Sequence, residues 1–152
     1  MSKSFYSPRE ELVLSKVGSM QQIAGVRRAV LDEGRERGMR VAEVRNGSGL
    51  AFTVLLDRGM DIYDANFCGL SLAFMGPVTP AHPSFYEPAG LGWLRNMGGG
   101  MLVGCGLRSV GSPSEFDGES LGLHGRLSNN PVYDVSSSAG WTADSKYELQ
   151  VS

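Results

Sequence analysis

The sequence predicts an all-β fold, and three observations support this prediction. Short runs rich in β-branched and aromatic residues recur along the chain, as expected for strands. Glycine is frequent, with 21 residues among 152, and it clusters between these runs, where turns belong. Residues 39–45 alternate apolar and polar side chains, which is the period of a strand with one face on a core. Many short strands joined by glycine-rich turns are typical of β-sandwiches and barrels.

One short helix is expected before the strands. Ser7 is a candidate N-cap, Pro8 suits the first helical position, and Glu10 stands three residues after the cap. We expect this helix to run to Val17, because Gly18 follows and glycine commonly ends a helix.

The clearest strand pair is a hairpin between residues 39–45 and 50–56. Asn46-Gly47 begins the segment between them, and this dipeptide is a strong turn signal between strands. Residues 50–56 are almost uniformly apolar, as in a strand that is covered on both faces. Further strands are expected at residues 21–31, 61–67, 70–74, 101–107 and 133–135, with an incomplete strand at 147–152.

Two long loops interrupt the strands. Residues 76–92 contain four prolines, a density that excludes regular strand pairing. Such a segment is either a functional lid or a rigid surface crossover. Residues 111–122 carry three carboxylates, at Glu115, Asp117 and Glu119, which can face either water or a ligand.

Charge and targeting signals narrow the class of protein. The net charge is −2 and no basic stripe is present, so we expect no nucleic-acid partner. The polar N-terminus lacks the apolar core of a secretory signal, and no apolar run approaches membrane-spanning length. We therefore expect a cytoplasmic protein without a membrane partner.

The two cysteines predict neither a disulfide framework nor a metal site. Cys68 and Cys105 are too few and too far apart for either, and a reducing compartment keeps them as thiols. At Cys105 we favour buried packing over a nucleophile, because free cysteine is usually buried and no base stands near it in sequence.

The most informative segment is residues 121–131. Its histidine, His124, stands between glycines and close to Arg126. Histidine moves protons near neutral pH, and arginine presents a fixed fork of donors to oxygen atoms, a chemistry that suits a polyhydroxylated ligand. The alternative is a turn in which the glycines serve unusual dihedrals, His124 bonds to backbone and Arg126 is solvated.

Two further groups are candidate binding residues. Arg58 and Asp61 flank a turn at Gly59, and they either pair with each other or point into a cleft. Arg95 stands just before three consecutive glycines, where the backbone can approach a ligand closely or simply form a flexible strand entrance.

Three segments in order, residues 58–62, 99–107 and 123–126, resemble an uncharacterised branch of the aldose 1-epimerase (galactose mutarotase-like) superfamily. The resemblance spans roughly residues 26–135. It implies an antiparallel β-sandwich that binds a small-molecule sugar in a cleft, without a metal ion or an organic cofactor.

The resemblance also implies roles for individual residues. His124 matches the superfamily's sugar-site histidine, whose catalytic role is to hold or polarise sugar oxygens. Arg95 matches its sugar-binding arginine by position. Arg126, Arg58 and Asp61 are substrate-binding candidates from their neighbourhood.

The same resemblance implies a second histidine and a glutamate as the catalytic acid and base. Both come from the later half of a longer chain, whereas no histidine follows Val135 here and Glu148 lies in the incomplete strand. We therefore expect residues 1–152 to form a single partial domain, the N-terminal portion of the sandwich. Its open sheet edges predict either a missing C-terminal half or self-association as a homo-oligomer.

Three functions follow as hypotheses. In the first, the complete protein interconverts sugar anomers by acid and base catalysis, and residues 1–152 alone have little activity. In the second, the chain is an inactive fragment or a non-catalytic carbohydrate-binding module, with Arg95, His124 and Arg126 as donors and Trp93 or Tyr86 as a stacking surface. In the third, it is a structural β-domain whose glycines serve only turns.

Overall fold

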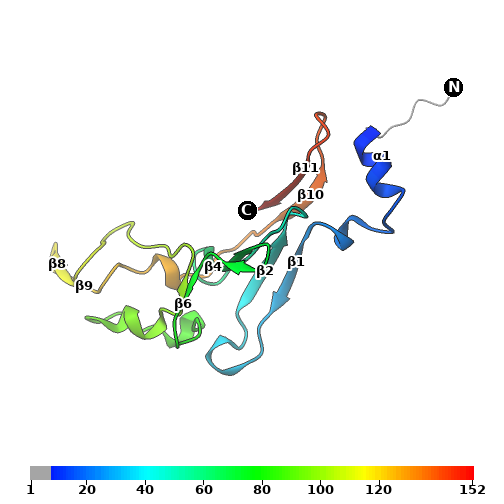
Figure 1. The fold of residues 1–152 in the computed structure, drawn as a ribbon. Helices are drawn as coiled ribbons and strands as arrows, with labels where there is room; N and C mark the ends of the chain where they lie inside the picture. Colours follow the sequence, from blue (N-terminus) through cyan, green and yellow to red (C-terminus); the bar gives the residue numbers. More distant parts are fainter. Residues whose placement is uncertain (1–7) are drawn as a thin grey trace.

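The computed structural model describes residues 8–152 and consists mainly of antiparallel strands (Figure 1). A five-stranded sheet has its strands in sequence order: β1 (Gly25–Val30), β2 (Arg40–Arg45), β3 (Leu50–Leu55), β4 (Asp61–Phe67) and β5 (Leu70–Ser71). The remaining strands form pairs: β6 (Phe74–Met75) with β7 (Gly99–Gly100), β8 (Ser114–Phe116) with β9 (Glu119–Leu121), and β10 (Ser137–Trp141) with β11 (Tyr147–Val151). The predicted all-β, antiparallel fold with one short N-terminal helix is confirmed.

The helical segments are short. The helix α1 (Pro8–Leu14) begins at the predicted proline and ends three residues before Val17; the N-cap candidate Ser7 lies outside the described residues. Five 3-10 helices follow: η1 (Met20–Gln22), η2 (Gly34–Glu36), η3 (Pro83–Phe85), η4 (Gly92–Asn96) and η5 (Leu127–Asn129). The strand expected at 21–31 begins only at Gly25, because the Ser19 hydroxyl caps η1 by accepting from the Gln21 amide.

The predicted β2–β3 hairpin is confirmed, and its turn explains the choice of residues. The Asn46 side-chain oxygen accepts from the amides of Ser48 (2.9 Å) and Leu50 (3.0 Å). Gly47 has a φ of 76° and Gly49 a φ of 103°, a region that favours glycine. Local chemistry therefore sets the register of these two strands.

Three other expected strands differ in the structure. Residues 70–74 divide between β5 and β6, and residues 133–135 form no strand. In the 101–107 segment only Leu102 makes a β-bridge, to Ile62. Downstream, the Gly104 amide donates to the Asp61 carboxylate and Leu107 adopts a φ of 69°, so the segment leaves the sheet. Cys105 is consequently exposed, and the prediction that it is buried was wrong.

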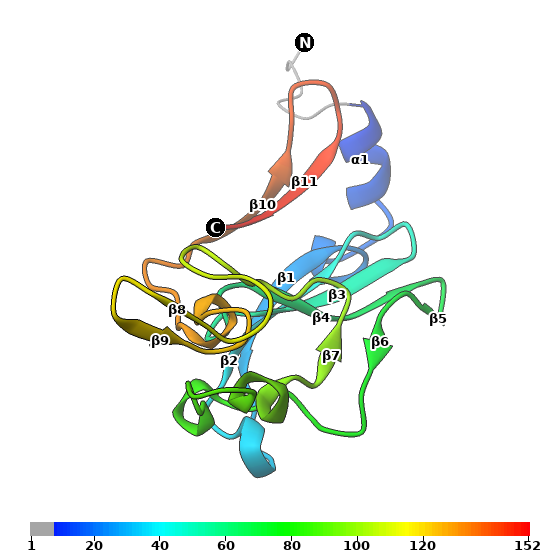
Figure 2. The same cartoon turned by 90° about the vertical axis from the view of Figure 1, so that its left-hand side faces the viewer.

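Two small cores lie on opposite faces of the sheet, because successive residues of a strand face opposite sides. Ala42, Val44, Val54 and Leu56 form one core, and Met39, Val41 and Leu55 form the other. The first is covered by side chains from the C-terminal segment: Val132, Val135, Leu149 and Val151. The β10–β11 hairpin thus supplies part of a second layer (Figure 2).

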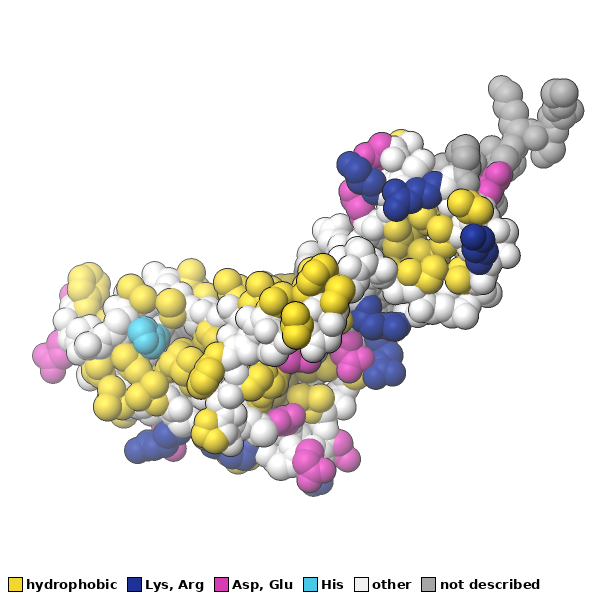
Figure 3. All heavy atoms as spheres, in the orientation of Figure 1, with side chains coloured by type: hydrophobic (Ala, Val, Ile, Leu, Met, Phe, Trp, Pro, Cys, Tyr) yellow, Lys and Arg dark blue, Asp and Glu magenta, His cyan; other side chains and the backbone are white. Residues whose placement is uncertain are grey.

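Apolar side chains also remain exposed on part of the surface. Figure 3 shows them spread over the region that carries β6, β8 and β9. Those near β5, β6 and β7 are Phe67, Leu70, Leu72, Phe74, Met75, Met101 and Leu102. No helix within residues 8–152 has the length and apolar content needed to cross a membrane.

Leu56→Ala is expected to lower the free energy of unfolding by about 2–5 kcal/mol, because the Leu56 side chain is fully buried and its loss leaves a cavity. Urea unfolding measures this change. Leu70→Ala is the matched control: its side chain is 73% exposed, so a change of no more than about 0.5 kcal/mol is expected. Equal losses in the two variants would contradict the described core.

Candidate functional site

A turn with three buried charged residues follows β3. Asp57, Arg58 and Asp61 are each at most 3% exposed. The Asp57 carboxylate accepts from Arg40 three times, from the backbone amide (2.6 Å), Nε (2.9 Å) and Nη2 (2.6 Å). The same Nη2 donates to the Val132 carbonyl at 2.7 Å. Asp57 therefore joins the start of β2 to the C-terminal segment.

Arg58 and Asp61 pair with each other, with 3.6 Å between Nε and Oδ2. Arg58 Nη1 also donates to the Ala81 carbonyl (3.1 Å) and to Asn129 Oδ1 (3.3 Å). Asp61 Oδ1 accepts from the Gly104 amide at 2.6 Å. Burial raises the pKa of Asp61 to about 6, against the opposing effects of the Gly104 amide and Arg58. Of the two alternatives for this motif, the structure shows the ion pair, and it holds three loops.

A buried polar layer continues from this pair to the 3-10 helices. Asn96 Nδ2 lies 3.5 Å from Asn129 Oδ1, and Trp93 Nε1 donates to Ser128 Oγ at 3.2 Å. Arg35 Nη2 donates to Asn96 Oδ1 at 2.9 Å. These contacts bind η4 to η5 across the interior, and the sequence carried no signal for them.

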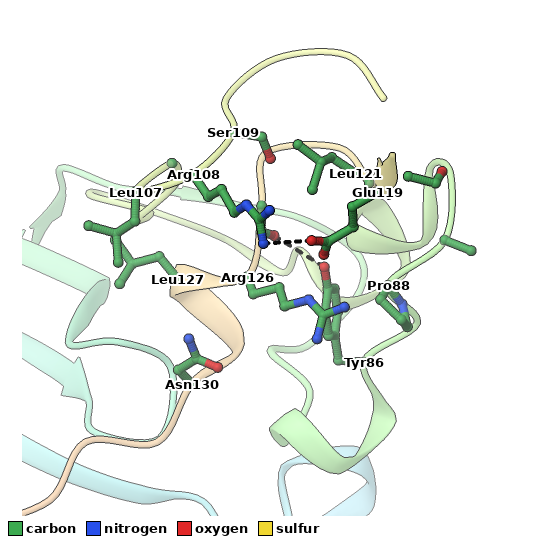
Figure 4. A pocket seen from close by; sticks show the side chains of 15 residues that line it. Tyr86, Pro88, Leu107, Arg108, Ser109, Glu119, Leu121, Arg126, Leu127 and Asn130 are labelled. Atoms are coloured by element: carbon green, nitrogen blue, oxygen red, sulfur yellow. Dashed lines mark hydrogen bonds and ion pairs between the residues drawn. The ribbon is translucent and has the colours of Figure 1, made fainter. Parts of the chain in front are cut away.

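A cavity of about 440 Å³ lies above this layer (Figure 4), within the size range of small-molecule sites. Its walls come from the loops at residues 86–89 and 106–109, from β9 with Gly122, from the turn at residues 125–127 and from Asn130. The lining residues are Tyr86, Pro88, Ala89, Gly106, Leu107, Arg108, Ser109, Glu119, Ser120, Leu121, Gly122, Gly125, Arg126, Leu127 and Asn130. Its floor is tied to the buried turn, because the Gly59 amide donates to the Asn130 carbonyl at 2.9 Å.

Two polar interactions lie within the lining of this pocket. Arg108 Nη1 pairs with Glu119 Oε2 at 2.5 Å, and the Tyr86 hydroxyl donates to the Gly125 carbonyl at 3.1 Å. Arg126 is exposed, and within residues 8–152 its guanidinium has no hydrogen bond or ion pair. Arg126 is thus the predicted site residue that lines the pocket.

His124 stands in the same turn but is not among the lining residues. Its Nδ1 accepts from the Gly111 amide at 3.1 Å, and its ring meets Trp93 edge-on at 4.8 Å. Because Nδ1 accepts, the neutral ring carries its proton on Nε2. His124 also has a φ of 57°, which is uncommon outside glycine and is held here by backbone bonds to Gly106 and Gly111.

The glycines around His124 permit close packing. A Cβ at Gly122 would overlap the Pro88 carbonyl oxygen. Gly125 has a φ of 71°, and a Cβ there would lie 2.9 Å from the Ser109 carbonyl. The two glycines therefore serve the packing of the pocket wall as well as access to it.

Tyr86, one of the two proposed stacking residues, also lines the pocket, whereas the other predicted site residues do not. Arg95 is exposed and forms an ion pair with Glu87, the neighbour of the lining residue Pro88. Arg58 and Asp61 bond to Asn129 and Gly104, which lie near the lining residues Asn130 and Gly106 in the sequence. Trp93, a proposed stacking surface, is only 6% exposed.

Several lining residues were not assigned from the sequence, Arg108 and Asn130 among them. Glu119, for which the sequence allowed either water or a ligand as neighbour, lines the pocket as the partner of Arg108. The glycines at 104, 106 and 111, which stand around Arg108, are the sequence signal that could have marked this segment as part of a site. In the described part of the chain, no three metal-ligating side chains come together.

Comparisons with known proteins place the chain in a family. A family described as "Domain of unknown function (DUF4432)" matches residues 36–152. The chain belongs to this family. No curated protein matches it.

One solved structure resembles this DUF4432 chain over most of its length. It is the crystal structure of a protein described as a "putative aldose 1-epimerase" from Klebsiella pneumoniae subsp. pneumoniae, with a TM-score of 0.73 and 28% sequence identity. The match covers 83% of this chain and 33% of the other, so the chain spans about a third of the length of that protein. The predicted relationship to the aldose 1-epimerase-like fold is confirmed.

Asp61 is expected to make stability fall as pH rises from about 4 to about 6.5. Its folded pKa lies above the ordinary value, so its stabilising protonated form is complete below about pH 4 and is lost as pH passes 6. A folded pKa about two units above the ordinary value corresponds to about 3 kcal/mol of unfolding free energy. The free energy of unfolding of the wild type minus that of Asp61→Asn should fall by this amount, and a constant difference would contradict the assignment.

Gly122→Ala is expected to displace the Pro88 segment, because the added Cβ overlaps the Pro88 carbonyl. The expected loss is about 1–3 kcal/mol of unfolding free energy. Gly140→Ala is the control, since nothing lies within 4 Å of a Cβ there. Thermal unfolding compares the two variants, and unchanged stability in Gly122→Ala would exclude the close contact.

Proposed function

We propose that this chain is a carbohydrate-binding protein of the aldose 1-epimerase type, and that the complete protein interconverts sugar anomers. The observation that carries this proposal is the likeness to the Klebsiella protein, at a TM-score of 0.73 and 28% identity. The cytoplasmic location expected from the sequence goes with this proposal and stays a prediction.

The pocket supports the proposal by its chemistry. A sugar presents a ring of hydroxyl groups, which require fixed donors and acceptors around them. The lining residues Ser109, Ser120, Asn130 and Arg126 provide them, and Leu107 and Leu127 add apolar surface. Such a mixture of apolar walls and few placed polar groups is common in small-molecule sites.

His124 is proposed as the residue that polarises a sugar oxygen. Anomer interconversion needs a base for the C1 hydroxyl proton and an acid at the ring oxygen, so that the ring opens, rotates and closes. The Gly111 amide sets the tautomer that leaves Nε2–H as a donor, and Nε2 has no partner among the described residues. Trp93 holds the ring in place from one edge.

A non-catalytic binding module is the second candidate, and one observation favours it. Within residues 8–152, Glu119 is the only carboxylate that lines the pocket, and its ion pair with Arg108 occupies it. The described lining therefore offers hydrogen-bonding groups to a sugar but no unpaired carboxylate to act as a base. In this alternative the same residues bind sugar without interconverting its anomers.

His124→Ala is expected to weaken the binding of neutral aldoses about tenfold, the size of one lost hydrogen bond. Ligand-observed NMR titration measures the affinity. His82→Ala is the control, because the His82 ring bonds to Ser84 at the start of η3. Equal affinity in wild type and His124→Ala would remove His124 from the site.

The same samples separate the two candidates. Exchange between α and β anomers, followed by NMR, is expected to be accelerated by the complete protein and to slow again in its His124→Ala variant. Sugar binding by the complete protein without acceleration would favour the module, and absence of sugar binding would overturn both.

A further inference from the structure

The charges of the pocket do not balance. Among the residues that the structure describes, the charged ones in its lining are Arg108, Arg126 and Glu119. Arg108 and Glu119 neutralise each other through their ion pair, drawn as a dashed line in Figure 4, whereas Arg126 has no such line. One guanidinium thus remains available to a ligand. It presents several donors in a plane that matches a carboxylate or a phosphate.

The backbone beside Arg126 adds further donors. Gly125 has a φ of 71°, and Arg126 follows with φ −113° and ψ −3°. A left-handed residue followed by a right-handed one turns successive amides toward a common side, an arrangement that binds anions. Among the described residues, the amides of Gly125, Arg126 and Leu127 make no hydrogen bond. All three residues line the pocket.

We propose that the pocket takes a sugar that carries an anionic group, and that this group binds to the Arg126 guanidinium and the amides of residues 125–127. This inference rests on the proposed sugar-binding function and narrows its ligand class. The anion is a carboxylate or a phosphate. Each has two neighbouring oxygens that can accept two hydrogen bonds from the Arg126 guanidinium. The neutral part of the ligand faces Ser109, Ser120 and Asn130.

The Arg108–Glu119 pair determines which part of the pocket attracts an anion. Because Glu119 is held at Arg108, the region around this pair carries little net charge and suits hydroxyl groups. The remaining positive charge is that of Arg126, in the turn that precedes η5. The anionic end of the ligand therefore lies at this turn.

Calorimetric titration of residues 1–152 with four probes tests the proposal: galacturonate, glucose 6-phosphate, neutral galactose and inorganic phosphate. At least one of the two anionic sugars is expected to bind tenfold or more tightly than galactose, and the preferred one identifies the anion as carboxylate or phosphate. High salt should reduce this preference, since Arg126 is exposed.

Arg126→Gln is expected to weaken binding of the preferred anionic sugar at least tenfold, so that its advantage over galactose is lost. Arg126→Lys keeps the charge but loses the fork, so it should retain part of the preference. Arg37→Gln is the matched control, because this exposed arginine pairs with Asp32 outside the pocket. Circular dichroism confirms that each variant is folded.

The outcomes separate this inference from the proposed function. Equal binding of anionic and neutral sugars, or a preference that survives in Arg126→Gln, would overturn the inference and leave sugar binding intact. Binding of inorganic phosphate at Arg126 without binding of any sugar would support the anion site and overturn the sugar function. Binding of none of the four probes would overturn both.

Discussion

The structure depends on the need to satisfy three buried charges in one turn. Asp57, Arg58 and Asp61 are withdrawn from water, and an unpaired buried charge costs several kcal/mol. Their partners come from distant parts of the chain: Arg40, Ala81, Gly104 and Asn129. Loops that have few apolar contacts of their own are therefore gathered at one end of the sheet.

The pocket is a consequence of this gathering. Its floor bonds to the buried turn through the Asn130 carbonyl, and its wall closes where Gly122 meets Pro88. Hydrogen bonds and close backbone contacts hold the loop walls in place, and the strand β9 forms a further wall. The pocket is thus built on loops, as many binding sites are, but its base is a fixed polar core.

This arrangement separates residues that support the site from residues that can meet a ligand. Arg58 and Asp61 bond to the loops that carry the lining residues, while Arg126 faces the cavity. His124 belongs to neither group: Gly111 holds one ring nitrogen, and the other has no partner within residues 8–152. The proposed sugar function relies on the residues that can meet a ligand. The stability of the site relies on the residues that support it.

Local chemistry in the sequence determined the all-β character, the start of α1 at Pro8, the β2–β3 hairpin and the bounds of β4. Each follows from contacts between near neighbours: a proline with a fixed φ, an Asn46 side chain that bonds its own turn, an alternation of side chains. The turn at His124 was also recognisable, because glycines and an ionisable pair stand together there.

Tertiary structure alone decided the burial of Arg58 and Asp61, the exposure of Cys105 and the pairing of Arg108 with Glu119. These depend on which distant loops meet, and a buried charge draws its partners from any part of the chain, so no local pattern records them.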